Sequence, residues 1–369
     1  MEEAWYTVEN MDEIDTPSLV IYLDRVQKNI DVLKSYVSDT SLLRPHVKTH
    51  KSLNVTSLLL EAGIEKFKCA TIAEAEMLAQ AGAPDALLAY QPVGPKAERL
   101  AHLIERYPTT TFSCLVDDEQ VADHLNEVME SIHHCIPVYI DLNVGMNRTG
   151  IKPGPKAIDL YLVLSKKDGI LPMGLHAYDG HIRDTDLAER TRRCDDAFNE
   201  VLEMKKELMA KGMEEPIIIA GGSPTFPIHA RRKDVECSPG TFIYWDKGYH
   251  DMLPEQPFEY AALVFTRVIS KPSDDIVCID LGHKSIASEN PLNKRIEFLN
   301  VDDLEPVGHS EEHMVLKVNG NKLKVGDVLV GVPYHICPTC ALYDTAVVVT
   351  HHKVVDRWAV TSRNRKLTV

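Results

Sequence analysis

The chain is constrained most by a regular alternation of short β-forming runs and longer amphipathic segments, from about residue 18 to residue 245. Alternation of this kind implies parallel strands joined by right-handed helical crossovers. We expect strands near 42–48, 66–70, 86–90, 110–114, 136–142, 171–178, 216–220 and 236–243, and helices over 73–81, 95–105, 118–132, 155–166 and 185–211. Eight such units close a (β/α)8 barrel. No Gly-x-Gly-x-x-Gly turn follows the first strand to favour the rival doubly wound sheet.

The pattern changes after about residue 255, where long helical segments stop. β-rich runs then follow at 261–269, 276–279, 313–318, 328–330 and 345–349. A chain of 369 residues is also long enough for two domains. We therefore predict a barrel over 18–250 and a β-rich domain that consists of residues 251–369 together with residues 1–17. The run 18–22 is expected to pair with the β-rich domain, so that the two domains interleave.

Composition excludes several classes of function. The formal net charge is -15, from 40 basic and 55 acidic side chains, which argues against nucleic-acid or anionic-membrane binding. No apolar stretch approaches the ~20 residues of a spanning helix. The acidic N-terminus, residues 1–5, has no apolar run typical of a signal peptide, and the eight cysteines are scattered. These features predict a cytoplasmic protein with reduced thiols.

Active sites of such barrels lie at the carboxyl ends of the strands, with phosphate held after strands seven and eight. In this chain those two ends read Gly221-Gly222-Ser223-Pro224-Thr225 and Ser238-Pro239-Gly240-Thr241. Glycine lets backbone N–H groups approach phosphate oxygens, and a hydroxyl adds a donor. Either loop alone is also consistent with a plain turn. Their joint placement favours a phosphate site.

The first expected strand ends at Lys48, beside Arg44, His46 and His50. A lysine there is either an ordinary charged rim residue or an amine activated by burial or by a neighbouring cation. Lys51 is less suited, since it falls past the strand end. An activated amine and a phosphate pocket in one cleft are what pyridoxal phosphate requires.

A second cluster lies late in the chain, where His335 and Cys337 are two residues apart. On an extended segment they face the same side and can bind one metal ion, and imidazole with thiolate suits zinc. Two protein ligands leave positions for water or substrate, as in a catalytic metal site. A buried cysteine beside a packed histidine is the alternative. Cys337 and Cys340 also form a Cys-x-x-Cys, a less favoured redox pair because no helix start is evident.

These motifs resemble the D-threonine aldolase and D-serine dehydratase family, fold-type III pyridoxal-phosphate enzymes built like alanine racemase. The resemblance covers nearly the whole chain and is strongest at 44–51, 221–225, 239–241, 310–313 and 335–337. It implies that Lys48 carries the cofactor, with Arg148 near its ring and Tyr178 near the substrate. It also implies a divalent metal on His335 and Cys337, and a homodimer. The phosphate would be held at Ser223, Thr225, Gly240 and Thr241.

The family catalyses two reactions on D-β-hydroxy amino acids: cleavage to glycine and an aldehyde, and dehydration followed by loss of ammonia. Pro338, Thr339 and the later Leu-Tyr-Asp match the aldolase context, but Cys337 stands where aldolases tend to have a carboxylate. A thiolate favours zinc, whereas a carboxylate accepts manganese or magnesium more readily. We favour the aldolase, with a dehydratase of D-serine or D-threo-3-hydroxyaspartate as the alternative. His181 is a candidate base for the hydroxyl proton, or a loop histidine bonded to backbone.

Three further interpretations stay open. An amino-acid racemase uses the same scaffold without a metal. A non-catalytic pyridoxal-phosphate carrier is a second, although the long β-rich region counts against it. A sugar-phosphate or nucleotide barrel enzyme is the third, and would not absorb visible light.

Overall fold

The computed structural model describes residues 4–320 and 322–369, so the first three residues of the acidic N-terminal stretch lie outside the described part. By its contacts the chain forms two compact units. One contains residues 33–48, 53–240 and 364–369, and the other contains residues up to 32, 49–52 and 241–363. The domain borders expected at residues 18 and 250 stay a prediction.

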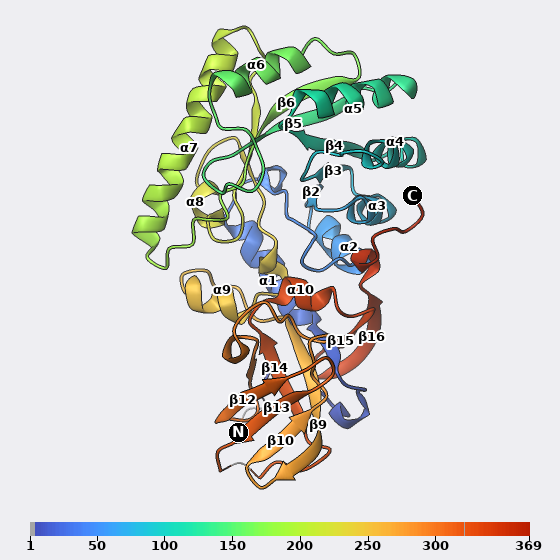
Figure 1. Cartoon of the computed structure of the whole chain (residues 1–369), viewed down its shortest axis with the longest axis vertical. Helices are drawn as coiled ribbons and strands as arrows, with labels where there is room; N and C mark the ends of the chain where they lie inside the picture. Colours follow the sequence, from blue (N-terminus) through green and yellow to red (C-terminus); the bar gives the residue numbers. More distant parts are fainter. Residues whose placement is uncertain (1–3, 321) are drawn as a thin grey trace. The chain divides into compact units, whose positions relative to one another are not determined.

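The first unit is built on a parallel sheet of seven strands in chain order (Figure 1). Each neighbouring pair is parallel, as the alternation predicts. The side chains of Leu87, Leu115, Tyr139 and Ile219 come from four different strands and pack in one cluster, which places them inside a curled sheet. The strands are β2 (Lys66–Cys69), β3 (Asp85–Leu88), β4 (Thr111–Val116), β5 (Ile136–Leu142), β6 (Ile170–Ala177), β7 (Ile217–Ala220) and β8 (Val235–Cys237).

The segment before Lys48 closes this sheet, although it is not the regular strand that we expected over 42–48. Leu43 forms a parallel bridge with Cys237 of β8, and His46 forms one with Lys68 of β2. The prolyl residue between them, Pro45, has no N–H to donate, so an unbroken ladder is not possible there. The segment thus joins the two edge strands, and the fold is a (β/α)8-type barrel.

Helices follow the strands and cover the outer face of the sheet (Figure 1). The carboxylates of Asp118 and Asp186 accept from the first turns of α5 and α7, and the Thr71 hydroxyl does the same for α3. The helices are α2 (Leu53–Glu61), α3 (Ile72–Gln80), α4 (Lys96–Arg106), α5 (Glu119–Ser131), α6 (Pro155–Leu164), α7 (Leu187–Ala210) and α8 (Phe226–His229). The five helices expected from periodicity are confirmed, each within two residues at either end.

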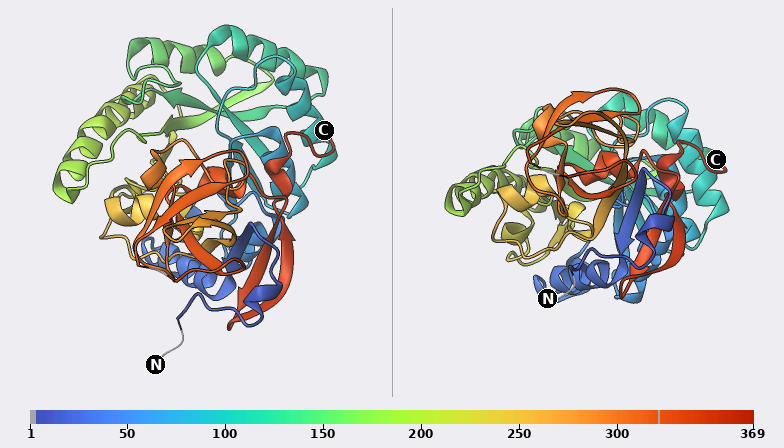
Figure 2. Two further views of the ribbon diagram at one scale, coloured as in Figure 1. Left: turned by 60° about the horizontal axis from the view of Figure 1, so that its bottom comes forward. Right: turned by 90° about the horizontal axis from the view of Figure 1, so that it is seen from below.

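The second unit is a mostly antiparallel nine-stranded sheet (Figure 2). Strand β1 pairs with β15 in parallel and with β9 antiparallel, which confirms that residues 18–22 join the β-rich region. The strands are β1 (Ser18–Tyr22), β9 (Ala262–Ser273), β10 (Ile276–Ile279), β11 (Ile296–Phe298), β12 (Leu304–His309), β13 (Met314–Val318), β14 (Val328–Pro333), β15 (Thr345–Thr350) and β16 (Lys353–Ala359). The α-helices of this unit are α1 (Leu23–Ser35), α9 (Lys247–Met252) and α10 (Ile336–Cys340). Among the described residues, no helix is long and apolar enough to cross a membrane.

Candidate active site

Lys48 follows the closing segment of the barrel and is half-buried. Its backbone N–H donates to His46 Nδ1 at 3.2 Å, and the His46 N–H donates to the Pro239 carbonyl at 2.9 Å. His46 therefore ties the lysine-bearing turn to the loop after β8. Two other expected neighbours act differently. Arg44 is buried in ion pairs with Asp85 and Glu236, and burial lowers the pKa of His50 to about 3.

Tyr178 follows β6 and lies between two glycines. A Cβ on Gly180 would meet the Tyr178 hydroxyl at 2.2 Å, and one on Gly222 would meet its ring at 3.0 Å. Only residues without a side chain allow the ring to pack so closely at both positions. The Arg148 guanidinium lies 4.8 Å from the centre of the same ring. The structure thus brings Arg148, Tyr178 and the Gly221–Thr225 loop together.

The expected phosphate loops meet within the barrel unit. The Gly240 N–H donates to Ser223 Oγ at 3.4 Å, linking the ends of β7 and β8. Gly221 has a φ of 79°, in the left-handed region that favours glycine, and a Cβ there would meet the His229 ring at 2.7 Å. Among the described residues the buried Ser238 hydroxyl has no hydrogen-bond partner, so a donor is available for an anion. Thr241 groups with the second unit instead.

His181 follows β6, and its ring lies beside Gly145, which belongs to the loop after β5. A Cβ on Gly145 would meet His181 Nε2 at 2.7 Å, and the buried Nδ1 has no partner among the described residues. Burial lowers the pKa of His181, with Asp179 opposing this effect. A neutral imidazole with an unpaired nitrogen can accept a proton.

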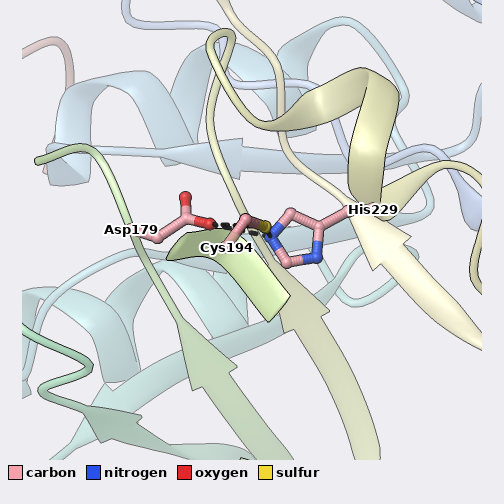
Figure 3. Close-up of side chains that lie close together, drawn as sticks. All are labelled: Asp179, Cys194 and His229. Carbon is pink, nitrogen blue, oxygen red and sulfur yellow. Dashed lines mark hydrogen bonds and ion pairs between the residues drawn. The ribbon is translucent and has the colours of Figure 1, made fainter. Parts of the chain in front are cut away.

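A buried cluster of three side chains that contacts the Gly221–Thr225 loop escaped the sequence reasoning. The cluster consists of Asp179, Cys194 and His229 (Figure 3). One metal-binding atom from each of Asp179 (carboxylate oxygen), Cys194 (sulfur) and His229 (ring nitrogen) lies within 4.8 Å of the other two. Asp179 accepts from His229 Nε2 at 2.8 Å and from Thr225 Oγ1 at 2.7 Å. Arg232, which can only donate, bonds to His229 Nδ1. A metal on Nε2 would require a proton on Nδ1, so we infer a hydrogen-bond network that holds the loop.

This inference predicts that Cys194→Ala leaves the metal content of the purified protein unchanged. Burial raises the pKa of the Cys194 thiol to about 12, so the thiolate that a metal requires is disfavoured. Metal analysis by mass spectrometry checks the prediction, with His335→Ala as the matched variant that should lose metal. Loss of metal in Cys194→Ala, with His335→Ala unaffected, would move the metal site to this cluster.

His335 and Cys337 do come together, but not on the extended segment that we expected. His335 is the N-cap of α10, and Cys337 lies in its first turn. Although burial opposes protonation, the Cys337 thiolate and Glu289 raise the pKa of His335 to about 9. His335 Nδ1 lies 2.5 Å from Glu289 Oε1. A carboxylate on the second imidazole nitrogen is the usual partner of a metal-binding histidine.

The Cys337 thiol has hydroxyl neighbours, Thr49 Oγ1 at 3.0 Å and Thr241 Oγ1 at 3.5 Å. Cys340 is fully buried, and burial raises its pKa well above the usual range. All eight cysteines are free thiols. The helix start that seemed absent from the sequence does exist, yet the buried Cys340 thiol is a poor nucleophile for a redox pair.

The barrel mouth carries cations without matching carboxylates. Among the described residues, no carboxylate oxygen lies within 4.0 Å of the side-chain nitrogens of Lys48, Lys68 or Arg148. Lys68 was missed by the sequence reasoning and is buried inside the barrel. Unpaired cations, a free serine hydroxyl and glycine-containing loops fit an anionic, phosphate-bearing group. The residues present therefore suit pyridoxal phosphate.

The fold and the glycine-containing loops at its strand ends define a class of barrel proteins suited to a phosphate-bearing cofactor. Residues 21–247 match the family model of the alanine racemase N-terminal domain, and residues 261–349 match a putative serine dehydratase domain. The chain belongs to the alanine racemase-like family, in the lyase branch in which a barrel precedes a serine dehydratase-type domain.

Several proteins that are similar over nearly their full length carry aldolase names, and one carries a dehydratase name. The chain is 27% identical to a 3-hydroxy-D-aspartate aldolase of Paracoccus denitrificans, covering 96% of this chain and 93% of the relative. It is 28% identical to a D-threonine aldolase of Arthrobacter, covering 95% and 93%. The crystal structure of D-threonine aldolase from Filomicrobium marinum matches with a TM-score of 0.89 and 27% identity, over 97% of this chain and 98% of that one.

Proposed function

We propose that the protein is a pyridoxal-phosphate- and metal-dependent aldolase that cleaves D-β-hydroxy amino acids to glycine and an aldehyde. The observation that carries this proposal is the full-length likeness to D-threonine aldolase, at 28% identity in sequence and a TM-score of 0.89 in structure. The cation-rich barrel mouth around Lys48 supports it independently. The homodimer implied by the resemblance is part of the proposal, and light scattering should give twice the chain mass of 41.4 kDa.

Lys48 is proposed to hold the cofactor, with the Ser223–Thr225 loop, Gly240 and Thr241 holding its phosphate. When bound, pyridoxal phosphate supplies an aldehyde that condenses with amines and a ring that accepts the electron pair released at the α-carbon. Lys48 contributes a primary amine, which has no ion-pair partner among the residues that the structure describes and is available for that bond. Arg148 contributes a cation over the Tyr178 ring and a donor for an anionic oxygen.

His181 is proposed to remove the proton of the β-hydroxyl. Its lowered pKa keeps the imidazole neutral at pH 7, and Nδ1 has no partner among the described residues. Tyr178 is proposed to face the substrate, because Gly180 and Gly222 fix the ring in one position. Tyr178 orients the hydroxyl-bearing carbon, and His181 receives the hydroxyl proton when the bond between the α- and β-carbons breaks.

His335 and Cys337 are proposed to hold the divalent metal, with zinc favoured and manganese or magnesium possible. Glu289 supports the histidine as an outer carboxylate. A bound divalent cation supplies a Lewis acid for an oxygen of the substrate. The thiolate of Cys337 is the softer of the two ligand types known for this position, and this favours zinc.

A dehydratase acting on D-serine or D-threo-3-hydroxyaspartate is the second candidate. Two observations favour it: Cys337 replaces the carboxylate expected in aldolases, and the second domain matches a putative serine dehydratase domain. A racemase and a non-catalytic carrier stay as weaker alternatives, because neither explains the His335 and Cys337 pair.

Product analysis from D-threonine separates these activities. The reconstituted protein is incubated with D-threonine, with and without a chelator, and acetaldehyde and 2-oxobutanoate are assayed in the same sample. Metal-dependent acetaldehyde supports the aldolase. 2-Oxobutanoate as the main product contradicts it and favours the dehydratase. Chelator-resistant conversion to L-allo-threonine, the product of inversion at the α-carbon alone, favours a racemase.

We expect His181→Gln to lower kcat by about 100-fold or more with little change in KM, because glutamine keeps the size and polarity but cannot accept the proton. Steady-state kinetics with D-threonine checks this. The absorption band of the cofactor should be unchanged, which serves as the control for folding and loading. Unchanged turnover would remove His181 from the mechanism.

A further inference from the structure

Lys68 projects into the interior of the barrel, close to the proposed cofactor lysine. In the β2–β3 register it is the partner of Leu87, which belongs to the interior cluster of the barrel. Register partners in parallel strands project to the same face of the sheet. Lys68 is also the bridge partner of His46, two residues before Lys48. Only 3% of Lys68 is exposed.

A histidine and an aspartate hold the Lys68 amine. Lys68 Nζ lies 3.2 Å from His176 Nε2, and His176 Nδ1 lies 2.7 Å from Asp141 Oδ1. Asp141 and His176 are register partners in the β5–β6 pair, so their side chains share a face. The Asp141 carboxylate accepts a hydrogen bond from the Nδ1–H of His176, which leaves Nε2 as an acceptor for the amine. This arrangement orients Lys68 without neutralising it.

Most of the hydrogen-bonding capacity of Lys68 is unused. An ammonium has three donors, and His176 takes one. Among the described residues no carboxylate lies within 4.0 Å of Nζ, and the nearest aromatic partner is the Tyr178 ring at 5.7 Å. Lys66, two residues earlier on the same strand, shows the contrast, because it is ion-paired with Glu236. A buried ammonium without such a partner is costly unless a ligand supplies one.

We propose that Lys68 is an anion-binding residue of the site, held by His176 and Asp141 to donate to an anionic oxygen of the bound ligand. This inference rests on the proposed function. Two sources offer that chemistry: the α-carboxylate of the amino acid and the ring oxygen of the cofactor. Contact with an anion would satisfy the two free donors and balance the charge of two neighbouring lysines.

The electrostatic surroundings of Lys68 give the proposal a pH signature. Burial, followed by the charge of Lys48, lowers the pKa of Lys68 to about 7. The ammonium form that binds an anion is therefore present below about pH 7 and is lost as the pH rises. Arginine stays charged at this position at any working pH. The charged or titratable groups facing Lys68 are Lys48, Arg44, Asp141, Asp179, His176 and Tyr178.

The experiment compares Lys68→Met and Lys68→Arg in the reconstituted holoenzyme, with Lys66→Met as the matched control. The resting absorption spectrum reports on the cofactor, and KM and kcat for D-threonine between pH 6 and 8.5 report on the substrate. The wild type is measured first: if it shows neither cofactor band nor turnover, the proposed function fails, and not this inference alone.

If Lys68 binds the substrate carboxylate, Lys68→Met should raise KM at least tenfold at pH 6.5 with the resting spectrum unchanged. KM of the wild type should rise above pH 7, and Lys68→Arg should keep a low KM without that rise. If Lys68 contacts the cofactor ring oxygen, Lys68→Met should shift the resting band instead. Should the methionine variant fail to fold by circular dichroism, Lys68→Gln takes its place. Kinetics, pH profile and spectrum equal to those of Lys66→Met would overturn the proposal.

Discussion

Lys48→Ala is expected to abolish the absorption band near ~420 nm that a lysine-bound cofactor gives. Turnover of D-threonine should fall by roughly 10³-fold or more, the scale seen when a covalent residue is removed from an active site. The reason lies in the position of Lys48, since it ends the segment that closes the barrel and has no ion-pair partner among the described residues. Visible spectroscopy and the acetaldehyde assay measure both effects.

Lys51→Ala is the matched control for this prediction. Lys51 is three residues away and has a φ of 51°, which alanine tolerates no worse than lysine. The control should keep both the band and the activity, and both variants should melt close to the wild type. If the band survives in Lys48→Ala and is lost in Lys51→Ala, the cofactor is carried by Lys51, and our assignment to Lys48 is wrong.

The second large effect is expected at the metal pair. His335→Ala should remove the bound metal and lower the activity by roughly 100-fold or more. Mutation of residues that only hydrogen-bond to a metal ligand already lowers metal affinity or activity by about 10- to 100-fold. Cys337→Asp should retain activity but shift the metal preference from zinc towards manganese, because a carboxylate is the harder ligand. Metal content and activity after reconstitution with each metal are measured together.

Cofactor loading provides the control for the metal prediction. The band near ~420 nm should persist in both variants, because the residues proposed for the cofactor differ from those proposed for the metal. Full activity of His335→Ala in the presence of a chelator would contradict the assigned metal site. If Cys337→Asp shows the same order of activity with zinc and manganese as the wild type, the thiolate does not set the metal preference.

Elements with a strong periodic pattern could be predicted from the sequence. Helix α7 has apolar positions at helical spacing and an Asp186 cap, and it was expected over nearly its full length. The segment over 42–48 was expected as a strand from the alternation of short and long segments, but Pro45 interrupts the ladder and two isolated bridges form there. Helix α10 has five residues, too few for any periodicity, so the geometry at His335 could not be foreseen.

The site was predictable where a rule ties a residue to a strand end, and not where distant segments meet. Lys48 and the Gly221–Thr225 loop followed from the barrel rule. Lys68 had a signal that was available, because Lys-Phe-Lys-Cys alternates and places a lysine on an inward face. The contacts among Asp179, Cys194 and His229 had none, since these residues come from a strand end and two helices.

The central claim is that Lys48 carries the cofactor, and chemical trapping tests it most directly. The protein reconstituted with pyridoxal phosphate is reduced with borohydride, which makes the bond between cofactor and lysine permanent, and its peptides are mapped by mass spectrometry. The account predicts one pyridoxyl group per chain, on Lys48. A group on another lysine, or no modified peptide after loading, would contradict it.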